Sequence, residues 1–440
     1  MPSERENPHT LPLTDEEPLV QIATLAVEVV DGPDQGRRAG GDADVLAIGS
    51  AEGNQLHLSD PHVSRFHCEL ELVEDGIRIR DTGSTNGVWL GKARITEAIV
   101  GPGTELRVGD TVVRVAEGEP ASQEIYIAHR LGDLCGRTEK MRRLLSLVDR
   151  ASKTDASVLI TGESGTGKEL VARALHDCGG RRKGPFVTVD CGALAANLVA
   201  SELFGHERGA FTGADRRREG AFARANGGTL FLDEIGELPA DLQPTLLGAL
   251  ERRRFRRVGG SEELSTDVRV VAATHRDLRD RVNEGSFRLD LFYRLAVIQL
   301  KVPPLRERRG DIELLCDHFL AQYGESKTAR ELFGDTDLDR LLRHDWPGNV
   351  RELRNAVEAR LAMGETFGLP EADVQPSVAV DGVLSLPYRE ARAAVIRDFE
   401  ASYFGHHLHA ADGNVAKAAR LMRMDRSHLF TLLREHPDLR

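Results

Sequence analysis

Two short stretches of the sequence carry residues that can bind and cleave a phosphate anhydride. The first is GESGTGKE, which lies between the apolar run SVLIT and the amphipathic segment ELVARALHDC. In a strand, glycine loop and helix of this order, backbone N–H groups and the helix N-terminus surround phosphate, and the lysine reaches the terminal phosphates. The stretch therefore predicts an ATP site made by Gly162, Glu163, Ser164, Gly165, Thr166, Gly167, Lys168 and Glu169.

The second stretch, GGTLFLDE, ends an apolar run with two adjacent acids. Glu169 stands where such glycine loops usually have Ser or Thr, so the hydroxyl that would bind Mg²⁺ is missing there. Asp233 is then predicted to hold Mg²⁺, and Glu234 to polarise the attacking water. Acidic strand ends are common, and it is the pairing with Lys168 that favours ATP hydrolysis.

Three kinds of structure are needed to position these residues and the rest of the chain. Between 131 and 363, runs such as FVTVD and VRVVAAT alternate with helical patterns, which predicts an α/β domain with a mainly parallel sheet. Short alternating runs between 19 and 116 predict an all-β sandwich, and the end of the chain is helical. The predicted divisions are a disordered start at 1–18, the sandwich at 19–116, a linker at 117–130, the ATPase domain at 131–363 with a helical lid from about 305, a linker at 364–387 and an all-α domain at 388–440.

Composition limits the class of protein. A chain of 440 residues is too long for a single hydrophobic core. Residues 1–128 carry 23 acidic and 10 basic side chains, a net charge of −13, and because the whole chain has a net charge of −12 the remainder has about +1. The 5 cysteines are odd in number and form no CxxC pair, which favours neither disulfides nor zinc. No apolar run approaches a membrane span or a signal peptide core, so we expect a cytoplasmic protein without a membrane partner.

The longer motifs point to a family. GESGTGKELVARALH, SELFGHERGAFTGA, GGTLFLDEIGELP, FRLDLFYRL, VPPLRERRGDI and WPGNVRELRN occur in this order. Together they resemble the central AAA+ ATPase domain of the bacterial enhancer-binding activators that act on RNA polymerase carrying sigma-54. The resemblance implies an ATP-driven ring, by analogy a hexamer, that converts closed promoter complexes to open ones.

A glycine-rich loop is the most distinctive of these motifs. Its glycines free the backbone, which predicts a mobile loop that carries a large apolar residue, and an internal packing loop is the alternative. The resemblance implies that this loop contacts sigma-54, with Phe211 and Thr212 as the main contacts. The implied contact residues are Gly209, Ala210, Phe211, Thr212, Gly213 and Ala214.

Further roles follow from the resemblance, position by position. Thr274 and His275 match sensor I, which reads the γ-phosphate, and Arg351 matches sensor II. Arg288 and Arg294 match arginines that reach the nucleotide of a neighbouring subunit. Asp190 stands where relatives often have an Asn that couples to the catalytic glutamate; a carboxylate can accept a hydrogen bond there but cannot donate one.

The segment from Asp412 to His436 predicts two helices around a short turn. One apolar face is formed by Val415, Ala418, Ala419 and Met422, and the other by Leu429, Leu432 and Leu433. The segment resembles the Fis-type helix-turn-helix of the same activators, which implies enhancer DNA as a partner, and a plain helical hairpin is the alternative. Arg426, Ser427, His428 and Thr431 are then expected at base edges, and Lys417, Arg420 and Arg434 at phosphates.

The N-terminal sandwich contains LAIGS, SRFH and DTGSTNG at the spacing of a forkhead-associated (FHA) domain. The resemblance implies a phosphothreonine protein or a Ser/Thr kinase as a partner, bound by Ser64, Arg65, Thr85 and Asn86. His67 is expected to be a structural hydrogen-bonding group. Ser50 replaces the arginine that usually holds the phosphate, so a docking module that no longer reads phosphate is the alternative.

These motifs together favour a sigma-54-dependent transcriptional activator with an FHA sensor, an ATPase ring and a DNA-binding end. One alternative is an AAA+ remodelling ATPase with another target, and the complete GAFTGA hexapeptide argues against it. The other is a DNA-binding regulator with an inert ATPase domain that does not act on sigma-54. The presence of Lys168, Asp233, Glu234, Arg288 and Arg294 argues against that reading.

Overall fold

The computed structural model describes residues 19–364, with gaps at 23, 42–44, 74, 119–120, 125, 127 and 193–195, and beyond them 387–392, 396, 403–404, 415–422, 424 and 429. The chain divides into two compact units, Met1–Leu369 and Pro370–Arg440, and each is described by itself. Among the described residues, no helix is both long and apolar enough to cross a membrane.

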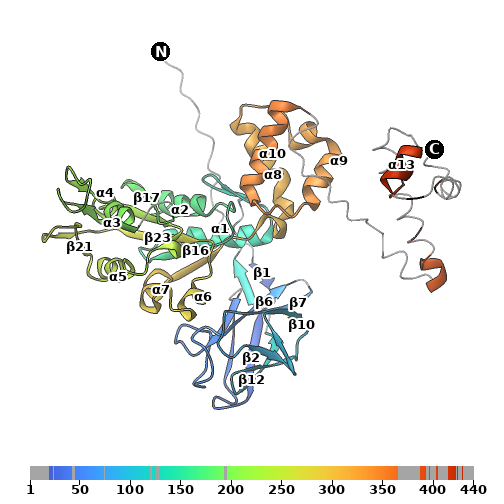
Figure 1. Ribbon diagram of the computed structural model, residues 1–440, viewed down its shortest axis with the longest axis horizontal. Coiled ribbons are helices and arrows are strands. Elements are labelled where there is room, and N and C mark those ends of the chain that lie inside the picture. The colour runs from blue at the N-terminus through green and yellow to red at the C-terminus, as the bar shows by residue number, and fades with distance from the viewer. Residues whose placement is uncertain are drawn as a thin grey trace. The chain divides into compact units, whose positions relative to one another are not determined.

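The N-terminal part of the first unit is a β-sandwich (Figure 1). One sheet has the order β10 (Glu97–Val100), β7 (Gly76–Asp81), β6 (Cys68–Val73), β4 (Val45–Gly49) and β5 (Leu56–His57). The other has the order β3 (Arg38–Gly41), β2 (Leu25–Asp31), β12 (Thr111–Glu117), β11 (Glu105–Val108), β8 (Val88–Leu90) and β9 (Ala93–Ile95). Alternate residues of each strand point inward, as Leu25, Val27 and Val29 do in β2, so the predicted sandwich is confirmed.

A short strand pair lies beside the sandwich. β1 (Leu19–Ile22) pairs antiparallel with β13 (Ala121–Glu124). β13 falls inside the segment 117–130 that the sequence predicts to be a linker, because a polar, alternating stretch of this length gives no signal until its partner strand is known.

The ATPase domain contains a parallel sheet of 5 strands, as the sequence predicts. Its order is β17 (Phe186–Asp190), β20 (Thr229–Asp233), β23 (Arg269–Thr274), β16 (Val158–Thr161) and β24 (Ile298–Lys301). All six residues of β23 are buried, as expected for a strand covered by helices on both faces. The last strand, β24, lies at the edge of the sheet beside β16 and corresponds to none of the apolar runs SVLIT, FVTVD, TLFLD and VRVVAAT.

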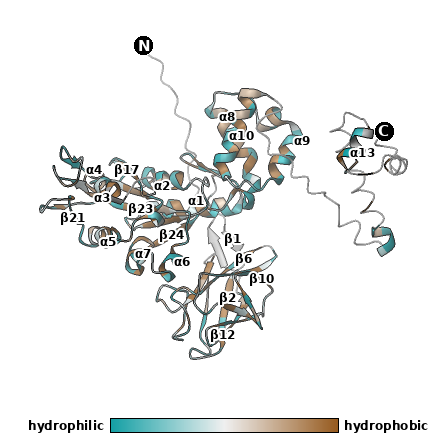
Figure 2. Ribbon diagram, in the orientation of Figure 1, coloured by the Kyte–Doolittle hydropathy of each residue, from teal (hydrophilic) through white to brown (hydrophobic). Residues whose placement is uncertain are grey.

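Alternate residues of the strands enter two separate cores, which Figure 2 shows as brown segments along the sheet. Phe231 joins the core under α1 (Glu139–Ser152) and α2 (Lys168–Asp177), whereas Leu230 and Leu232 join the other core. That second core is covered by α3 (Ala196–Phe204), α4 (Ala221–Arg224), α5 (Gln243–Arg252), α6 (Leu278–Asn283) and α7 (Leu289–Leu295). The smaller elements are β14 (Arg130–Leu131), β15 (Leu134–Cys135), β18 (Gly205–His206), β19 (Arg218–Glu219), β21 (Arg254–Arg256), β22 (Glu263–Ser265), η1 (Ile235–Glu237), η2 (Leu305–Glu307) and η3 (Arg309–Asp311).

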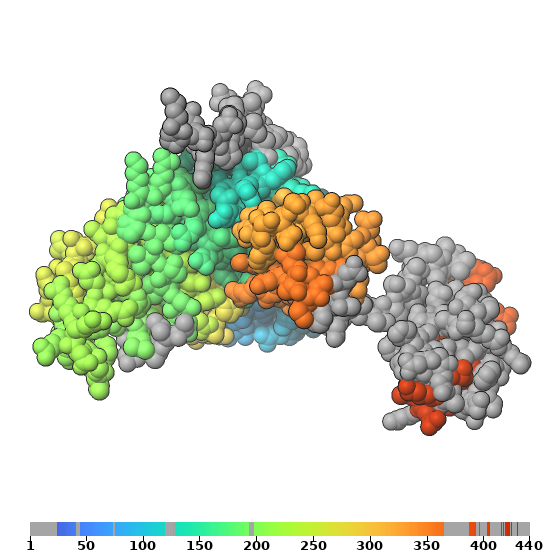
Figure 3. Space-filling model, turned by 90° about the horizontal axis from the view of Figure 1, so that it is seen from above, coloured from blue at the N-terminus to red at the C-terminus, as the bar shows by residue number. Residues whose placement is uncertain are grey.

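A helical lid follows the sheet and has a core of its own. It consists of α8 (Ile312–Gln322), α9 (Ala329–Arg343) and α10 (Asn349–Met363), shown in orange in Figure 3. Trp346 is fully buried among them, and its indole N–H donates to the carbonyl of Leu341 at 2.9 Å. A lid with a separate core can shift as one body relative to the sheet.

The second unit contains α13 (Val415–Leu421). Ala419, Met422 and Leu429 are buried together with Phe404, which agrees with the apolar faces predicted for this segment. Lys417 and Arg420 are exposed on α13. The remaining residues predicted to contact DNA lie outside the described residues: Arg426, Ser427, His428, Thr431 and Arg434.

Phe231 offers a test of this layered packing. It is fully buried and stacks on Phe186 with ring centroids 6.0 Å apart, so Phe231→Ala should destabilise the ATPase domain by about 3–5 kcal/mol. Calorimetry should show a lower melting temperature for one transition. Ile99→Ala, at a side chain that is 51% exposed on the sandwich, is the control and should change the free energy of unfolding by less than about 0.5 kcal/mol.

Candidate functional site

The predicted phosphate loop joins β16 to α2. Gly162, Gly165 and Gly167 have φ values of 155°, 78° and 104°, which residues with a side chain rarely adopt, so glycine is required at each. Lys168 begins the helix, and its Nζ donates to the carbonyls of Gly162 at 3.0 Å and Glu163 at 3.2 Å. The ammonium group is therefore held over the loop where phosphate oxygens would bind.

The lid contacts the phosphate loop directly. The guanidinium of Arg351 donates to the hydroxyl of Ser164 at 3.1 Å, so the predicted sensor II residue lies next to the loop. Asn349 donates to the Glu163 carboxylate at 3.0 Å and to the Ser164 carbonyl at 3.1 Å. A nucleotide bound at the loop would therefore be sensed by the first turn of α10.

Two arginines that the sequence analysis did not single out complete this contact. Arg306 binds both carboxylate oxygens of Glu163, at 2.9 and 2.6 Å. Arg308 is 2% exposed, donates to the carbonyl of Thr166 at 2.8 Å, and burial lowers the pKa of its guanidinium to about 10. Both lie in the quoted motif VPPLRERRGDI, but only the fold brings that motif to the phosphate loop.

Acidic groups gather at the carboxyl end of the sheet. Asp190 and Asp233 are register partners on β17 and β20, and Glu234 follows directly. Burial and the neighbouring Glu234 charge raise the pKa of Asp233 above its usual range, although the backbone N–H of Glu234 donates to it. A divalent cation would relieve this crowding of negative charge, so these residues fit the predicted Mg²⁺.

Among the described residues, one trio of metal-ligating side chains converges within 4.8 Å, and it lies elsewhere. It consists of Asp60, His62 and Asp110 in the sandwich loops. The two oxygens of Asp60 are already occupied by N–H and O–H donors of His62, Asp110 and Thr111. Magnesium needs only one or two protein carboxylates when phosphates supply the other ligands, so Asp233 remains the predicted ligand.

The predicted catalytic glutamate is held by a sensor residue. Glu234 has φ of 49°, and its Oε2 accepts from Nδ1 of His275 at 2.6 Å and from its backbone N–H at 3.2 Å. Its Oε1 lies 3.7 Å from Nζ of Lys168. Asp190 instead accepts from the backbone N–H of Gly192 at 2.8 Å.

The two sensor I residues differ in what they face. Thr274 is fully buried, and its hydroxyl accepts from the backbone N–H of Arg276 at 3.0 Å. His275 follows it at the edge of the sheet and contacts Glu234. The histidine, rather than the threonine, is therefore the side chain that can transmit the state of the site to the glutamate.

The two predicted finger arginines lie at the ends of α7, away from the phosphate loop. Arg288 precedes the helix and binds both carboxylate oxygens of Asp290, at 3.0 and 2.7 Å. Arg294 donates to the carbonyl of Leu250 at 2.9 Å. Both are exposed at the surface of the domain.

The GAFTGA loop is the tip of a short hairpin between β18 and β19. Gly209 and Gly213 have φ of 80° and 98°, and the N–H of Gly209 donates to the carbonyl of Ala214 at 2.8 Å. Thr212 is exposed. Phe211 is half-buried, with its ring edge-on to His206 at 5.0 Å, so the aromatic side chain folds back onto the base of its own hairpin.

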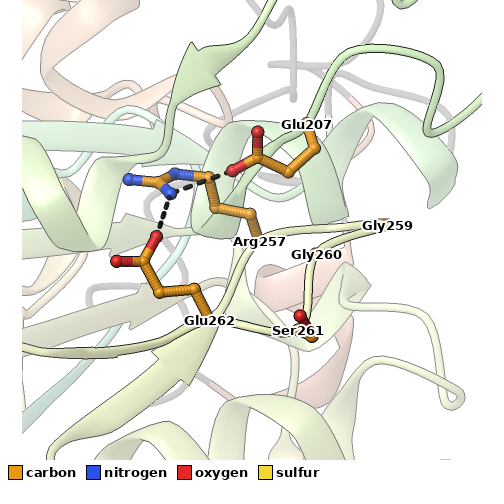
Figure 4. A pocket seen from close by; sticks show the side chains of 6 residues that line it. All are labelled: Glu207, Arg257, Gly259, Gly260, Ser261 and Glu262. Atoms are coloured by element: carbon orange, nitrogen blue, oxygen red, sulfur yellow. Dashed lines mark hydrogen bonds and ion pairs between the residues drawn. The ribbon is translucent and has the colours of Figure 1, made fainter.

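A second loop supports this hairpin, as Figure 4 shows. Arg257 is 6% exposed and binds Glu207 at 3.0 Å and Glu262 at 3.2 Å. A cavity of about 270 Å³ lies beside this ion pair, lined by Glu207, Arg257, Gly259, Gly260, Ser261 and Glu262. The Arg257 side chain thus connects the two loops, a role that no sequence pattern indicated.

The predicted phosphopeptide loops of the sandwich meet at one end. The backbone N–H of Thr85 donates to the Ser64 hydroxyl at 3.0 Å, and Asn86 donates to the carbonyl of His62 at 2.8 Å. Ser50 turns its hydroxyl to the carbonyl of Val63 at 3.0 Å. Arg65 is exposed and its side chain forms no hydrogen bond or ion pair with other described residues.

His67 has the structural role predicted for it. It is fully buried, accepts from the N–H of Ser64 at 3.1 Å on Nδ1, and has the Gly87 carbonyl 3.1 Å from Nε2. Burial lowers the pKa of His67, which keeps the ring neutral at pH 7. The ring therefore ties the two binding loops together.

Models of known protein families match three stretches of the chain. The Sigma-54 interaction domain matches residues 134–301, and the AAA+ ATPase lid domain matches 306–381. The sandwich, at 28–119, matches the cytoplasmic domain of the inner membrane component of T3SS. A solved FHA domain structure covers 21% of this chain and 95% of that chain, at 27% identity and a TM-score of 0.20.

Relatives extend over more of the chain. The chain is 44% identical over 301 residues to the transcriptional regulatory protein ZraR of Salmonella typhimurium, covering 68% of each protein. It is also 44% identical over 331 residues to the DNA-binding transcriptional regulator NtrC of Azospirillum brasilense, covering 69% of each.

Solved structures agree with these relatives. The chain is similar to NtrX from Brucella abortus, with a TM-score of 0.51 at 35% identity over 69% of each chain. The same protein in complex with ATP gives a TM-score of 0.50 over 70% of each chain. From the phosphate loop, its lid and these relatives together, the chain belongs to the sigma-54-dependent transcriptional regulators and carries an AAA+ ATPase as its central domain.

Proposed function

We propose that this protein uses ATP hydrolysis in a ring to remodel sigma-54 RNA polymerase from the closed to the open promoter complex. The observation that carries the proposal is the GAFTGA hairpin, which exposes Thr212 and is built onto the same domain as the phosphate loop. A loop of this sequence has no role inside an ordinary ATPase site.

The hydrolysis chemistry is assigned to three side chains. Lys168 leaves the loop carbonyls to contact the terminal phosphates, and its separation of 3.7 Å from Glu234 links the two groups. Glu234 then orients the attacking water, for which it must give up part of its hydrogen bonding to His275. Asp233 would hold Mg²⁺, which neutralises charge on the phosphate oxygens when bound.

The hairpin is coupled to the ATP site through one stretch of chain. The residues after Asp190 lead through α3 into β18, so a shift at the acidic edge of the sheet reaches the hairpin over a short path. α3 is anchored by Leu203 and Phe204, and Phe204 stacks on Phe222 at 5.6 Å. Because these side chains are closely packed, we assign to them the transmission of this shift to the hairpin.

The oligomer follows from the two arginines. Arg288 and Arg294 are exposed at the ends of α7, and we assign them to the nucleotide of a neighbouring subunit in a hexamer. Such a residue stabilises the charge that develops in the transition state. A monomer would then bind ATP but hydrolyse it slowly.

The remaining partners belong to the same proposal. The helical end, with Lys417 and Arg420 exposed on α13, is assigned to enhancer DNA. The sandwich is assigned to a phosphothreonine protein, with the exposed Arg65 in place of the arginine that Ser50 replaces. The cytoplasm is the compartment in which these partners are found.

Glu234→Gln separates binding from hydrolysis. The amide keeps the size of the side chain but cannot act as a base, so kcat for ATP hydrolysis should fall by about 10²-fold or more. ATP affinity, measured by fluorescence of a labelled analogue, should stay within about threefold. Hydrolysis at an unchanged rate would remove Glu234 from its assigned role.

Thr212→Ala tests the contact with the polymerase. Because Thr212 is exposed at the hairpin tip, the substitution should leave ATP hydrolysis within about twofold of wild type and abolish open-complex formation on a sigma-54 promoter. Thr96→Ala, at an exposed position of the sandwich, is the matched control and should keep both activities. Open complexes formed normally by Thr212→Ala would argue against the proposed function.

A further inference from the structure

A phenylalanine of the sandwich is part of the ATPase core. Phe66 is 2% exposed and lies in the same core cluster as Leu278, Val282 and Phe292, whereas its neighbours Val63 and Cys68 enter the core of the sandwich. Its ring meets that of Phe292 edge-on at 5.3 Å. Phe66 therefore packs the sandwich against α6 and α7 of the ATPase domain.

One amide side chain fixes two loops of the sandwich at this contact. Asn283, the last residue of α6, accepts from the backbone N–H of Phe66 at 3.3 Å and donates to the carbonyl of Phe66. It also donates to the carbonyl of Thr82 at 2.7 Å. Phe66 stands directly after Arg65, and Thr82 is the second residue of the DTGSTNG loop, so both ligand-binding loops are tied to α6.

Ion pairs surround this contact. Arg80 pairs with Asp277, Arg279 pairs with Glu69, and the ammonium of Lys301 lies 2.6 Å from Glu71. Arg279 also lies over the ring of Phe66, 5.6 Å from its centroid. Charges of opposite sign face each other in these three pairs, which favours one register of the contact.

The contact reaches α7 at a second point. The N–H of Gly53 donates to the hydroxyl of Tyr293 at 3.1 Å. A Cβ at Gly53 would lie 2.3 Å from Cε1 of Tyr293, so a side chain at this position would have to displace the Tyr293 ring and break its hydrogen bond. Gly53 is exposed and is not in the left-handed region, so a side chain is compatible with the sandwich itself.

We propose that Gly53, Phe66, Glu69, Glu71 and Arg80 form an interaction surface, the docking face, whose partner is the α6–α7 surface of the protein's own ATPase domain, and that docking restrains the ATPase. We infer the restraint from α7, because the sandwich contacts both Phe292 and Tyr293 of this helix. Arg288 and Arg294 lie on either side of these two residues. In the docked protein both arginines bind groups of their own chain. Release of the docking face frees the helix that must supply them to a neighbour.

This inference rests on the proposed role of the two arginines and adds a direction of control. A ligand bound by Ser64, Arg65 and Thr85 would contact the same two loops that Asn283 holds through Phe66 and Thr82. Such a ligand would therefore compete with docking. The sandwich is then an inhibitory module that ligand binding releases.

The test compares two glycine substitutions in the full-length protein. Gly53→Leu places a side chain against Tyr293, whereas Gly101→Leu, at an exposed glycine of the same sandwich with nothing within 4 Å of its Cβ position, is the matched control. Hydrogen exchange of the backbone amides of α6 reports docking. Gly53→Leu should lose protection there, hydrolyse ATP at least about threefold faster at equal protein concentration, and form rings at lower concentration by light scattering.

A charge reversal gives an independent readout. Glu71→Lys faces Lys301 with a like charge and should also release α6 and raise hydrolysis, and Lys301→Glu in the same chain should restore both toward wild type. Unchanged protection of α6 in both Gly53→Leu and Glu71→Lys would refute the docking face. Lost protection with unchanged or lower hydrolysis would refute the restraint. Failure of the proposed function is a different result, in which even the released variants hydrolyse ATP but form no open complexes.

Discussion

The parallel register of the ATPase sheet is the constraint on which the rest of the molecule depends. It places Thr161 beside Thr274 and Asp190 beside Asp233, so every strand of the site ends at one edge. Backbone hydrogen bonds between strands buried on both faces cannot slip without exposing apolar residues on the wrong side. The phosphate loop, the acids and the sensor residues are therefore fixed relative to one another before any ligand binds.

Around this fixed edge the protein arranges parts that can move. The lid has a core of its own and reaches the phosphate loop through polar contacts of Asn349, Arg351 and Arg306 rather than through apolar packing. Glu234 has a left-handed backbone conformation and bonds to His275, and Thr212 is exposed at the tip of its hairpin. A rigid sheet whose neighbouring parts are held by hydrogen bonds and ion pairs suits an enzyme that must convert ATP turnover into movement.

The surfaces outside the catalytic edge show how such a movement can be controlled. The apolar side chains of α6 and α7 are covered by Phe66, and ion pairs surround this contact. Burial of the aromatic ring supplies most of the attraction, while the charges select the register and add little net free energy.

The sequence alone determined the classes of structure and most of the chemistry. Glycine spacing, a lysine after a strand and a pair of acids after another predict the ATP site because those features act locally, and alternating apolar runs predict the sandwich and the parallel sheet. The positions of Arg306, Arg308 and Arg257 followed only from the tertiary structure, since nothing local distinguishes a buried arginine from one on a solvated face. The same is true of Phe66, a residue of the sandwich that is buried in the core of the ATPase domain. It is also true of Glu234, which bonds to His275 rather than to Asp190. Contacts between distant segments are decided by how the layers pack and not by the residues next to them in the chain.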